Sequence, residues 1–219
     1  MKDGGRGRVG RRDVEEYGRL IKNSTLKTSY FLGLLAEMLI RFPHERQRGQ
    51  TRMVVDRVSG LERLLLGLVA VGVFLLPAVY VSTSWLNWAD YRLSPRATRR
   101  AGSMGTALLA VAVWLFWRSH TDLGRNWSPS LQIREGHTLV TNGVYRSIRH
   151  PMYASIWLWG IAQALLLQNW IAGWASLVLF LPMYVLRVPR EEQMMLEQFG
   201  EAYRVYINQT GRVIPHLGA

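Results

Sequence analysis

Long apolar runs are the feature that most constrains how this chain can fold. The run LLLGLVAVGVFLLPAVYVST, within Leu61–Ser84, carries no charge after Arg63. A bilayer core of about 30 Å is crossed by roughly twenty apolar residues in a helix. Ala101–Trp117 is a second run of this kind, and its small residues allow close contact between helices. The sequence therefore predicts an all-α integral membrane protein.

Two further apolar segments, Met152–Leu167 and Trp170–Leu186, are separated by only Gln168 and Asn169. At 1.5 Å per residue, each segment is about 25 Å long as a helix. This predicts a tight C-terminal helical hairpin that barely spans a membrane. Leu26–Phe42 is a shorter candidate that contains three charged residues, Lys27, Glu37 and Arg41. We expect about five transmembrane helices, or four if this first segment does not cross.

Composition narrows the classes of partner. Hydrophobic residues make up 49% of the 219 residues, yet 27 Lys and Arg exceed 15 Asp and Glu. The basic residues are scattered through loops between apolar segments, which favours anionic lipid head groups over nucleic acid. Cysteine is absent, which excludes disulfides and thiolate chemistry, and five scattered histidines predict no metal site. A P-loop, a GxGxxG motif and an HExxH motif are also absent. We expect membrane lipid as a partner and no nucleic acid.

The polar regions divide the chain. Residues 1–22 are basic and Gly-rich, which predicts a disordered or surface-lying tail before a single membrane domain, 23–219. A polar connector of about thirty residues precedes the hairpin; such long loops are usually functional or disordered. Trp127 and Tyr145 within the connector favour order. After Arg187, apolar residues recur at three- and four-residue spacing, which predicts a helix lying against the bundle.

The start of the hairpin combines charge with helix geometry. Pro151 is suited to a first helical turn and keeps His150 out of helical geometry, so His150 should cap the helix. Exposed N–H groups at a helix N-terminus bind anions, and Arg149 adds positive charge there. This end of the helix could hold a polar or anionic ligand. The alternative is that both side chains only anchor the helix at the head groups.

The C-terminal end of the hairpin is expected to lie close to its N-terminal start. Because a two-helix hairpin brings its ends together, Arg187, Glu191 and Glu192 should lie within side-chain reach of Arg149 and His150, on one face of the membrane. Mixed charges facing one another suggest a ligand that bears both signs. A solvated helical face is the alternative for the paired acids.

The stretch HTLVTNGVYRSIRHPMY, the short hairpin, RVPREE and FGEAYRVY together resemble the isoprenylcysteine carboxyl methyltransferases and related phospholipid methyltransferases. The resemblance runs from about Leu123 to Pro215. The combination of RHPxY, hairpin and paired Glu at this spacing is specific, whereas RHP alone would be weak. One departure is Ser155, where the family often has Gly, which puts close packing there in doubt.

The resemblance implies a membrane enzyme that uses S-adenosylmethionine, held by the connector and tail on the cytoplasmic side. The cofactor is a zwitterion with a sulfonium, which suits a site with arginine, a helix N-terminus and glutamate. The implied cofactor contacts are Gln132, His137, Thr138, Leu139, Val140, Tyr145, His150, Pro151, Met152, Tyr153 and Glu191. Arg187 falls where the family places the arginine that faces the substrate carboxylate.

The function implied by this resemblance is methyl transfer to the carboxylate of a lipid-like acceptor, a prenylated cysteine or an analogue, with 123–215 as the catalytic part. A phospholipid N-methyltransferase is the alternative enzyme; its amine acceptor would need a base, with Glu192 or His150 as candidates. A non-catalytic membrane carrier or scaffold of the same fold is the third possibility. We expect a multi-pass protein of the plasma membrane in a prokaryote or of the endoplasmic reticulum in a eukaryote.

Overall fold

The computed structural model describes residues 11–48, 53–56, 59–127, 132–134 and 136–216. The longer helices are α1 (Arg11–Arg48), α2 (Gly60–Ala70), α3 (Leu76–Ser82), α4 (Pro95–Leu123), α5 (Pro151–Leu167), α6 (Ala175–Phe199) and α7 (Glu201–Gln209). The short helical turns are η1 (Val71–Leu75), η2 (Asn87–Ala89), η3 (Gly124–Asn126) and η4 (Gly143–Arg146), and the strands are β1 (Met53–Asp56) and β2 (Gln132–Arg134). The described part of the chain is therefore mostly helical.

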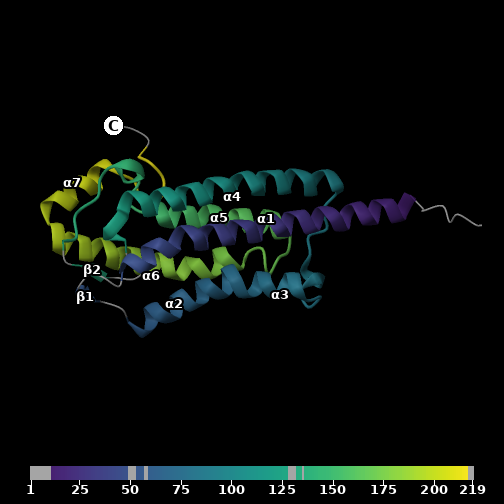
Figure 1. Ribbon diagram of the computed structural model, residues 1–219, viewed down its shortest axis with the longest axis horizontal. Helices are drawn as coiled ribbons and strands as arrows, with labels where there is room; N and C mark the ends of the chain where they lie inside the picture. The colour runs from purple at the N-terminus through teal and green to yellow at the C-terminus, as the bar shows by residue number, and fades with distance from the viewer. Residues whose placement is uncertain (1–10, 49–52, 57–58, 128–131, 135, 217–219) are drawn as a thin grey trace, which may run out of the picture.

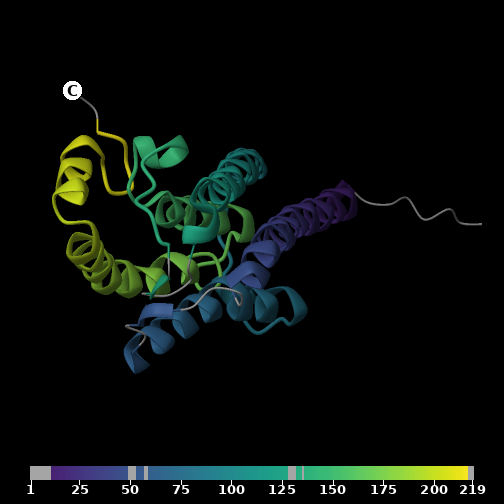
Figure 2. The same cartoon turned by 60° about the vertical axis from the view of Figure 1, so that its left-hand side comes forward.

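The long helices run side by side and form an elongated bundle (Figure 1). Helix α4 packs along α5, α1 packs against both, and α2 packs against α6. Figures 1 and 2 show that α7 lies at one end of this bundle, together with the connector that joins α4 to α5 in the chain. The loops that join α3 to α4 and α5 to α6 lie at the opposite end, where the N–H of Trp170 donates to the carbonyl of Ala89.

Helices α2 and α3 form one continuous rod, because the π turn η1 joins them without a break. Pro77 has no N–H to donate to the carbonyl four residues earlier. That carbonyl, on Val73, accepts a hydrogen bond from the hydroxyl of Tyr30 at 2.6 Å. The carbonyl of Gly72 accepts from the side-chain amide of Gln163 at 2.9 Å. Polar side chains of α1 and α5 thus satisfy the irregular backbone within an apolar core.

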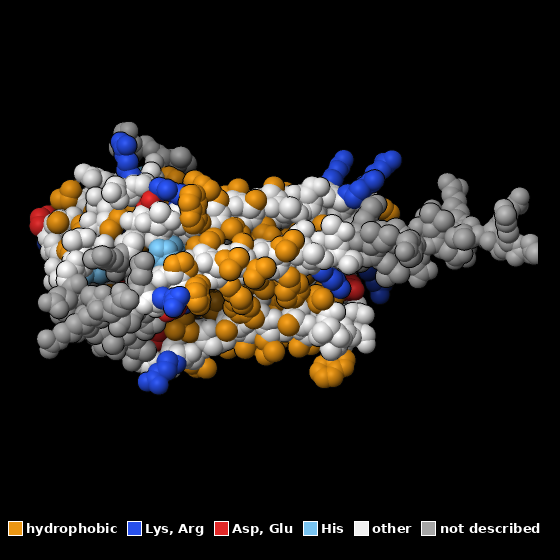
Figure 3. Space-filling model, in the orientation of Figure 1, with side chains coloured by type: hydrophobic (Ala, Val, Ile, Leu, Met, Phe, Trp, Pro, Cys, Tyr) orange, Lys and Arg blue, Asp and Glu red, His pale blue; other side chains and the backbone are white. Residues whose placement is uncertain are grey.

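Two helical stretches of the described chain, Gly60–Ser82 and Pro95–Leu123, are long and apolar enough to cross a membrane. Helix α5 is apolar but shorter. In the face drawn in Figure 3, hydrophobic side chains cover the middle of the molecule, and Lys and Arg lie toward its ends. This distribution is typical of a protein whose middle contacts lipid.

The hairpin of α5 and α6 is present, but its turn is longer than the predicted two residues. Helix α6 begins at Ala175, not at Trp170. Gln168 ends α5 in a left-handed conformation, with φ of 51°. The side-chain oxygen of Asn169 then accepts from the N–H groups of Ile171 and Ala172, which stabilises a turn before the second helix can begin.

Two other features differ from the sequence-based expectations. Helix α1 begins at Arg11, within the tail 1–22 predicted to be disordered or surface-lying, so residues 11–22 are helical; residues 1–10 lie outside the described part. The chain is not purely helical, since β1 and β2 pair antiparallel. The helix predicted after Arg187 is divided: α6 continues to Phe199, Gly200 has a φ of 53°, and α7 then follows and buries Tyr203 and Tyr206.

Candidate functional site

A cavity of about 210 Å³ lies at the end of the bundle that carries α7. It is formed by the start of α5, the second half of α6, α7 and the connector, with further lining residues from α1, α2 and α4. Ten of the eleven side chains predicted to contact the cofactor line it: His137, Thr138, Leu139, Val140, Tyr145, His150, Pro151, Met152, Tyr153 and Glu191. Arg187 lines it as well. Gln132 lies in β2, and the described part of the structure does not extend to its side chain.

The start of α5 has the predicted geometry, with Pro151 as the first helical residue and His150 as the N-cap. The C-terminal segment fixes this start from outside. The N–H of Arg149 donates to the carbonyl of Gly211, and the N–H of His150 donates to the carbonyl of Arg212, both at 2.8 Å. The helix N-terminus that borders the cavity is therefore positioned by residues more than fifty positions later in the chain.

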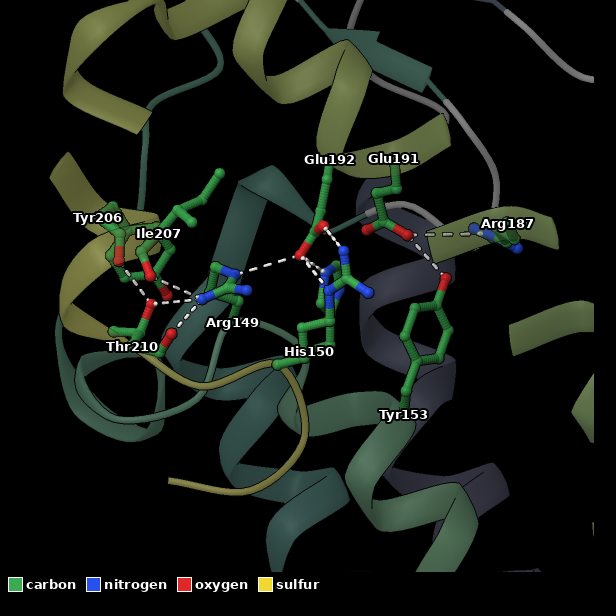
Figure 4. A network of polar contacts seen from close by, with 10 residues as sticks. Arg149, His150, Tyr153, Arg187, Glu191, Glu192, Tyr206, Ile207 and Thr210 are labelled. Atoms are coloured by element: carbon green, nitrogen blue, oxygen red, sulfur yellow. Dashed lines mark hydrogen bonds and ion pairs between the residues drawn. The ribbon is translucent and has the colours of Figure 1, made fainter. Parts of the chain in front are cut away.

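Glu192 is at the centre of a buried polar network (Figure 4). Its Oε1 lies 3.2 Å from Arg149 Nε and 3.3 Å from His150 Nε2. Arg212 donates from Nε to Oε1 at 3.2 Å and from Nη2 to Oε2 at 2.7 Å. Burial alone would raise the pKa of Glu192, but hydrogen bonds from His150 and Arg212, with their charges, lower it to about 2. Glu192 is thus an ionised anchor and a poor general base.

Arg149 lines the cavity, but most of its hydrogen bonds are made to the end of α7 and the residue that follows it. Its Nη1 donates to the carbonyl of Ile207 at 3.0 Å, and also to the carbonyl and hydroxyl of Thr210. These carbonyls lie at the C-terminal end of α7, where a cation is favourable. The predicted proximity of Arg149 to Glu192 is confirmed. Its expected contribution to an anion site stays a prediction.

Arg187, Glu191 and Tyr153 form a second polar group beside the first. The hydroxyl of Tyr153 donates to Glu191 Oε2 at 2.7 Å, and Arg187 Nε lies 3.8 Å from the same oxygen. Arg187 is only 6% exposed, and its Nε and Nη1 make no hydrogen bond among the described residues. Burial would lower the pKa of Arg187, but Tyr153, Glu191 and Glu62 raise it. The lining of the cavity therefore includes a charged guanidinium, two of whose donors make no hydrogen bond to a described residue.

The connector forms the remaining polar wall. Asn126 accepts from the N–H of Thr138 at 2.9 Å and donates to its hydroxyl at 3.1 Å, which fixes the segment His137–Val140. The carbonyl of Tyr145 accepts from the hydroxyl of Tyr206 at 2.6 Å. Burial lowers the pKa of His137, which favours its neutral form. The predicted order of the connector is confirmed over residues 136–150.

Gly143 gives a direct test of how the connector is held. Its φ is +58°, and a Cβ there would overlap the carboxylate of Asp122, which accepts the N–H of Val144. We expect Gly143→Ala to lower the thermal unfolding midpoint in detergent, because left-handed strain costs about 1–2 kcal/mol and the clash adds to it. Gly136→Ala is the matched control, since its φ is +74° but the added methyl group meets open space. Equal effects of the two variants would contradict the role of the Asp122 contact.

One part of the cavity, around His120, is aromatic and was not expected from any sequence motif. His120 is fully buried in α4, and its Nδ1 lies 2.9 Å from the carbonyl of Phe116. Because a carbonyl only accepts, Nδ1 carries the hydrogen and Nε2 is left as an acceptor. This Nε2 and the indole N–H of Trp127 have no hydrogen-bond partner among the described residues. The only sequence signal was a histidine at the end of an apolar run.

The comparison with known families bears on this same region. Residues 104–197 match the isoprenylcysteine carboxyl methyltransferase (ICMT) family. The match covers most of α4, the connector, α5 and most of α6, which form much of the cavity; the residues that α1, α2 and α7 contribute to it lie outside the match. The family resemblance inferred from the motifs is therefore confirmed for this part of the chain.

Individual relatives agree with the family match. Protein-S-isoprenylcysteine O-methyltransferase of Dictyostelium discoideum is 35% identical over 88 residues, covering 38% of this chain and 35% of that protein. Protein-S-isoprenylcysteine O-methyltransferase B of Arabidopsis thaliana is 33% identical over 96 residues, covering 43% and 49%. The chain thus spans between about a third and a half of these relatives' lengths. A solved structure of the eukaryotic intramembrane Ras methyltransferase ICMT aligns with a TM-score of 0.42 and 22% identity, covering 75% of this chain and 55% of that one.

Proposed function

We propose that this protein is a membrane methyltransferase that esterifies the carboxylate of a lipid-linked acceptor, with S-adenosylmethionine as methyl donor. The observation that carries the proposal is Arg187, a buried guanidinium with unused donors in the ICMT-like cavity. The acceptor class is a prenylated cysteine or an analogue, because the ICMT-family relatives are named for isoprenylcysteine.

The residues present suit the proposed cofactor. It would supply an electrophilic methyl group on a sulfonium. Glu191 offers a carboxylate to its positive charge, and the N-terminus of α5, at Pro151, suits its carboxylate. The segment His137–Val140 would provide a wall along the rest of the molecule. Within one cavity, the carboxylate of Glu191 would match the positive group of the cofactor, and the N-terminus of α5 would match its negative group.

The proposed reaction requires no proton transfer to a side chain of this protein. A carboxylate is already a nucleophile at neutral pH, so the acceptor needs no general base. Arg187 would orient it through a charge-assisted, bidentate pair, and alignment of reactants can supply much of the rate. Apolar cavity residues such as Leu66, Ile156 and Met183 would exclude water.

We place the bundle across the membrane with five spans: α1, the rod of α2 and α3, α4, α5, and the part of α6 that ends at Leu186, so that Arg187 and Glu192 lie beyond the last span. Exposed apolar side chains along α1, at Leu32, Leu35, Met38, Leu39 and Phe42, support its contact with lipid. Exposed Trp85, Trp88, Trp170 and Trp174 lie at the end away from the cavity, as in an interfacial belt. The cavity then lies at the cytoplasmic face, where S-adenosylmethionine is available.

A parallel transfer assay tests the proposal. Purified protein and S-adenosylmethionine with a labelled methyl group are incubated with S-farnesylcysteine, a fatty acid or phosphatidylethanolamine. We expect base-labile methyl ester on S-farnesylcysteine. Label on phosphatidylethanolamine alone would identify an N-methyltransferase. The absence of both transfer and S-adenosylmethionine binding, measured by calorimetry, would favour a non-catalytic carrier or scaffold.

Glu191 should contribute to cofactor affinity. We expect Glu191→Gln to weaken S-adenosylmethionine binding about tenfold, because it removes a charge worth about 1.4 kcal/mol in a charge-assisted contact. Calorimetry in detergent micelles measures the change. Glu201→Gln is the control, since its ion pair with Arg204 is exposed. Wild-type affinity in Glu191→Gln would remove Glu191 from the cofactor site.

A further inference from the structure

Glu62 is a buried acid in a part of the chain that the family match does not reach. It lies in the first turn of α2, is 4% exposed, and precedes the matched residues 104–197. The hydroxyl of Ser59 caps this helix by accepting the N–H of Glu62 at 3.2 Å. The cap stabilises the first turn of α2, and the Glu62 side chain makes its contact separately from it.

The carboxylate of Glu62 reaches Arg187 on α6. Glu62 Oε1 lies 3.4 Å from Arg187 Nη1, and both side chains are buried. On the other side, Glu191 approaches Arg187 Nε at 3.8 Å. Two acidic groups from different helices thus bracket one guanidinium. A buried cation needs such compensation, since its desolvation would otherwise be costly.

The two ion pairs of Arg187 are not hydrogen bonds. Its Nε and Nη1 make no hydrogen bond among the described residues, although a carboxylate oxygen lies near each of them. The two carboxylates therefore hold the guanidinium by charge and not by hydrogen bonds. If Glu62 lost its charge, the attraction of Glu191 would be unopposed, and Arg187 would turn toward its own helix.

We propose that Glu62 is a positioning residue that aims Arg187 at the acceptor carboxylate. This role rests on the proposed function. It makes the region before residue 104 part of the acceptor site, although that region carries none of the family motifs. The Glu62–Arg187 contact also couples α2 to α6, so the wall formed by Leu66 and Val69 is fixed relative to the arginine.

A purely structural role is the competing explanation. An acidic residue in the first turn of a helix is favourable in itself, and Ser59 with Glu62 has the spacing of a capping box. Ser59→Ala separates the two roles. It removes the cap of the same helix but keeps the carboxylate that faces Arg187.

The experiment compares Glu62→Gln, Glu62→Asp and Ser59→Ala, using S-farnesylcysteine as acceptor and calorimetry for the cofactor. We expect Glu62→Gln to lower acceptor kcat/KM about tenfold, mainly through KM, with cofactor Kd within about twofold of wild type. Glu62→Asp should recover part of the loss, because it restores the charge. Ser59→Ala should lower thermal stability yet keep the wild-type KM. In an Arg187→Lys background, Glu62→Gln should have little further effect on KM.

The outcomes separate the two proposals. If wild-type protein methylates no carboxylate, the proposed function fails, and the role of Glu62 fails with it. If wild type is active but Glu62→Gln has normal acceptor kinetics, or tighter acceptor binding, only the positioning role is overturned. A raised acceptor KM in Ser59→Ala equal to that of Glu62→Gln would assign Glu62 to helix stability.

Discussion

Arg187→Ala should lower kcat/KM for a carboxylate acceptor by roughly 10- to 100-fold, since a charge-assisted hydrogen bond contributes about 1.5–3 kcal/mol. The guanidinium is buried in the cavity and has unused donors, so its loss removes both charge and orientation. Misalignment of the acceptor would add to the loss. Steady-state kinetics with S-farnesylcysteine, alongside calorimetry for S-adenosylmethionine, measure the two effects separately. Cofactor affinity should stay near wild type.

Two further variants sharpen the interpretation of Arg187. Arg187→Lys should recover activity only in part, because an ammonium restores charge but not the planar fork. Arg190→Ala is a matched control, since this arginine is exposed on the same helix. If cofactor binding collapses in Arg187→Ala while the acceptor KM is unchanged, Arg187 belongs to the cofactor site. An amine acceptor predicts the opposite sign, because a fixed cation repels an ammonium.

The proximity of the hairpin's two ends could be predicted because it depends on local signals. A proline at a helix start, two apolar segments and a short turn are each visible in the sequence. They require residues near His150 to meet residues near Glu191, and this is observed. The length of the turn could not be predicted, because the side chain of Asn169 delays the second helix by accepting two backbone N–H groups.

The contacts that the sequence did not indicate are those made between distant segments. Glu62 and Arg187 are far apart in sequence, and only the packing of α2 on α6 brings them together. Arg212 lies in the C-terminal segment after α7, outside regular secondary structure. Its guanidinium donates to both carboxylate oxygens of Glu192. Arg149, expected at an anion site, donates to the end of α7, because the C-terminal segment folds back over the start of α5. No periodicity or motif encodes such pairings.

The second large effect is expected on stability, at Glu192, which links Arg212 of the C-terminal segment to the start of α5. Glu192→Gln should lower the free energy of unfolding by about 3 kcal/mol near neutral pH, because removing the acid from a buried network leaves the charge of Arg149 uncompensated and weakens the contact with His150. Arg212 moderates the loss, because its side chain is 51% exposed and can turn to solvent. Glu201→Gln, in an exposed pair with Arg204, should change stability by less than about 0.5 kcal/mol.

The pH dependence of this effect has a definite sign. The pKa of Glu192 falls from an ordinary 4.5 to about 2 in the folded protein, so the unfolded chain binds the proton first. The stabilisation by Glu192 is therefore fully present above about pH 4.5 and is lost as the pH falls toward 2. Unfolding midpoints of wild type and Glu192→Gln, measured in detergent from pH 7 downward, should converge over that range. A constant gap between the two curves would mean that the packing of the side chain, and not its charge, stabilises the end of the bundle that forms the cavity.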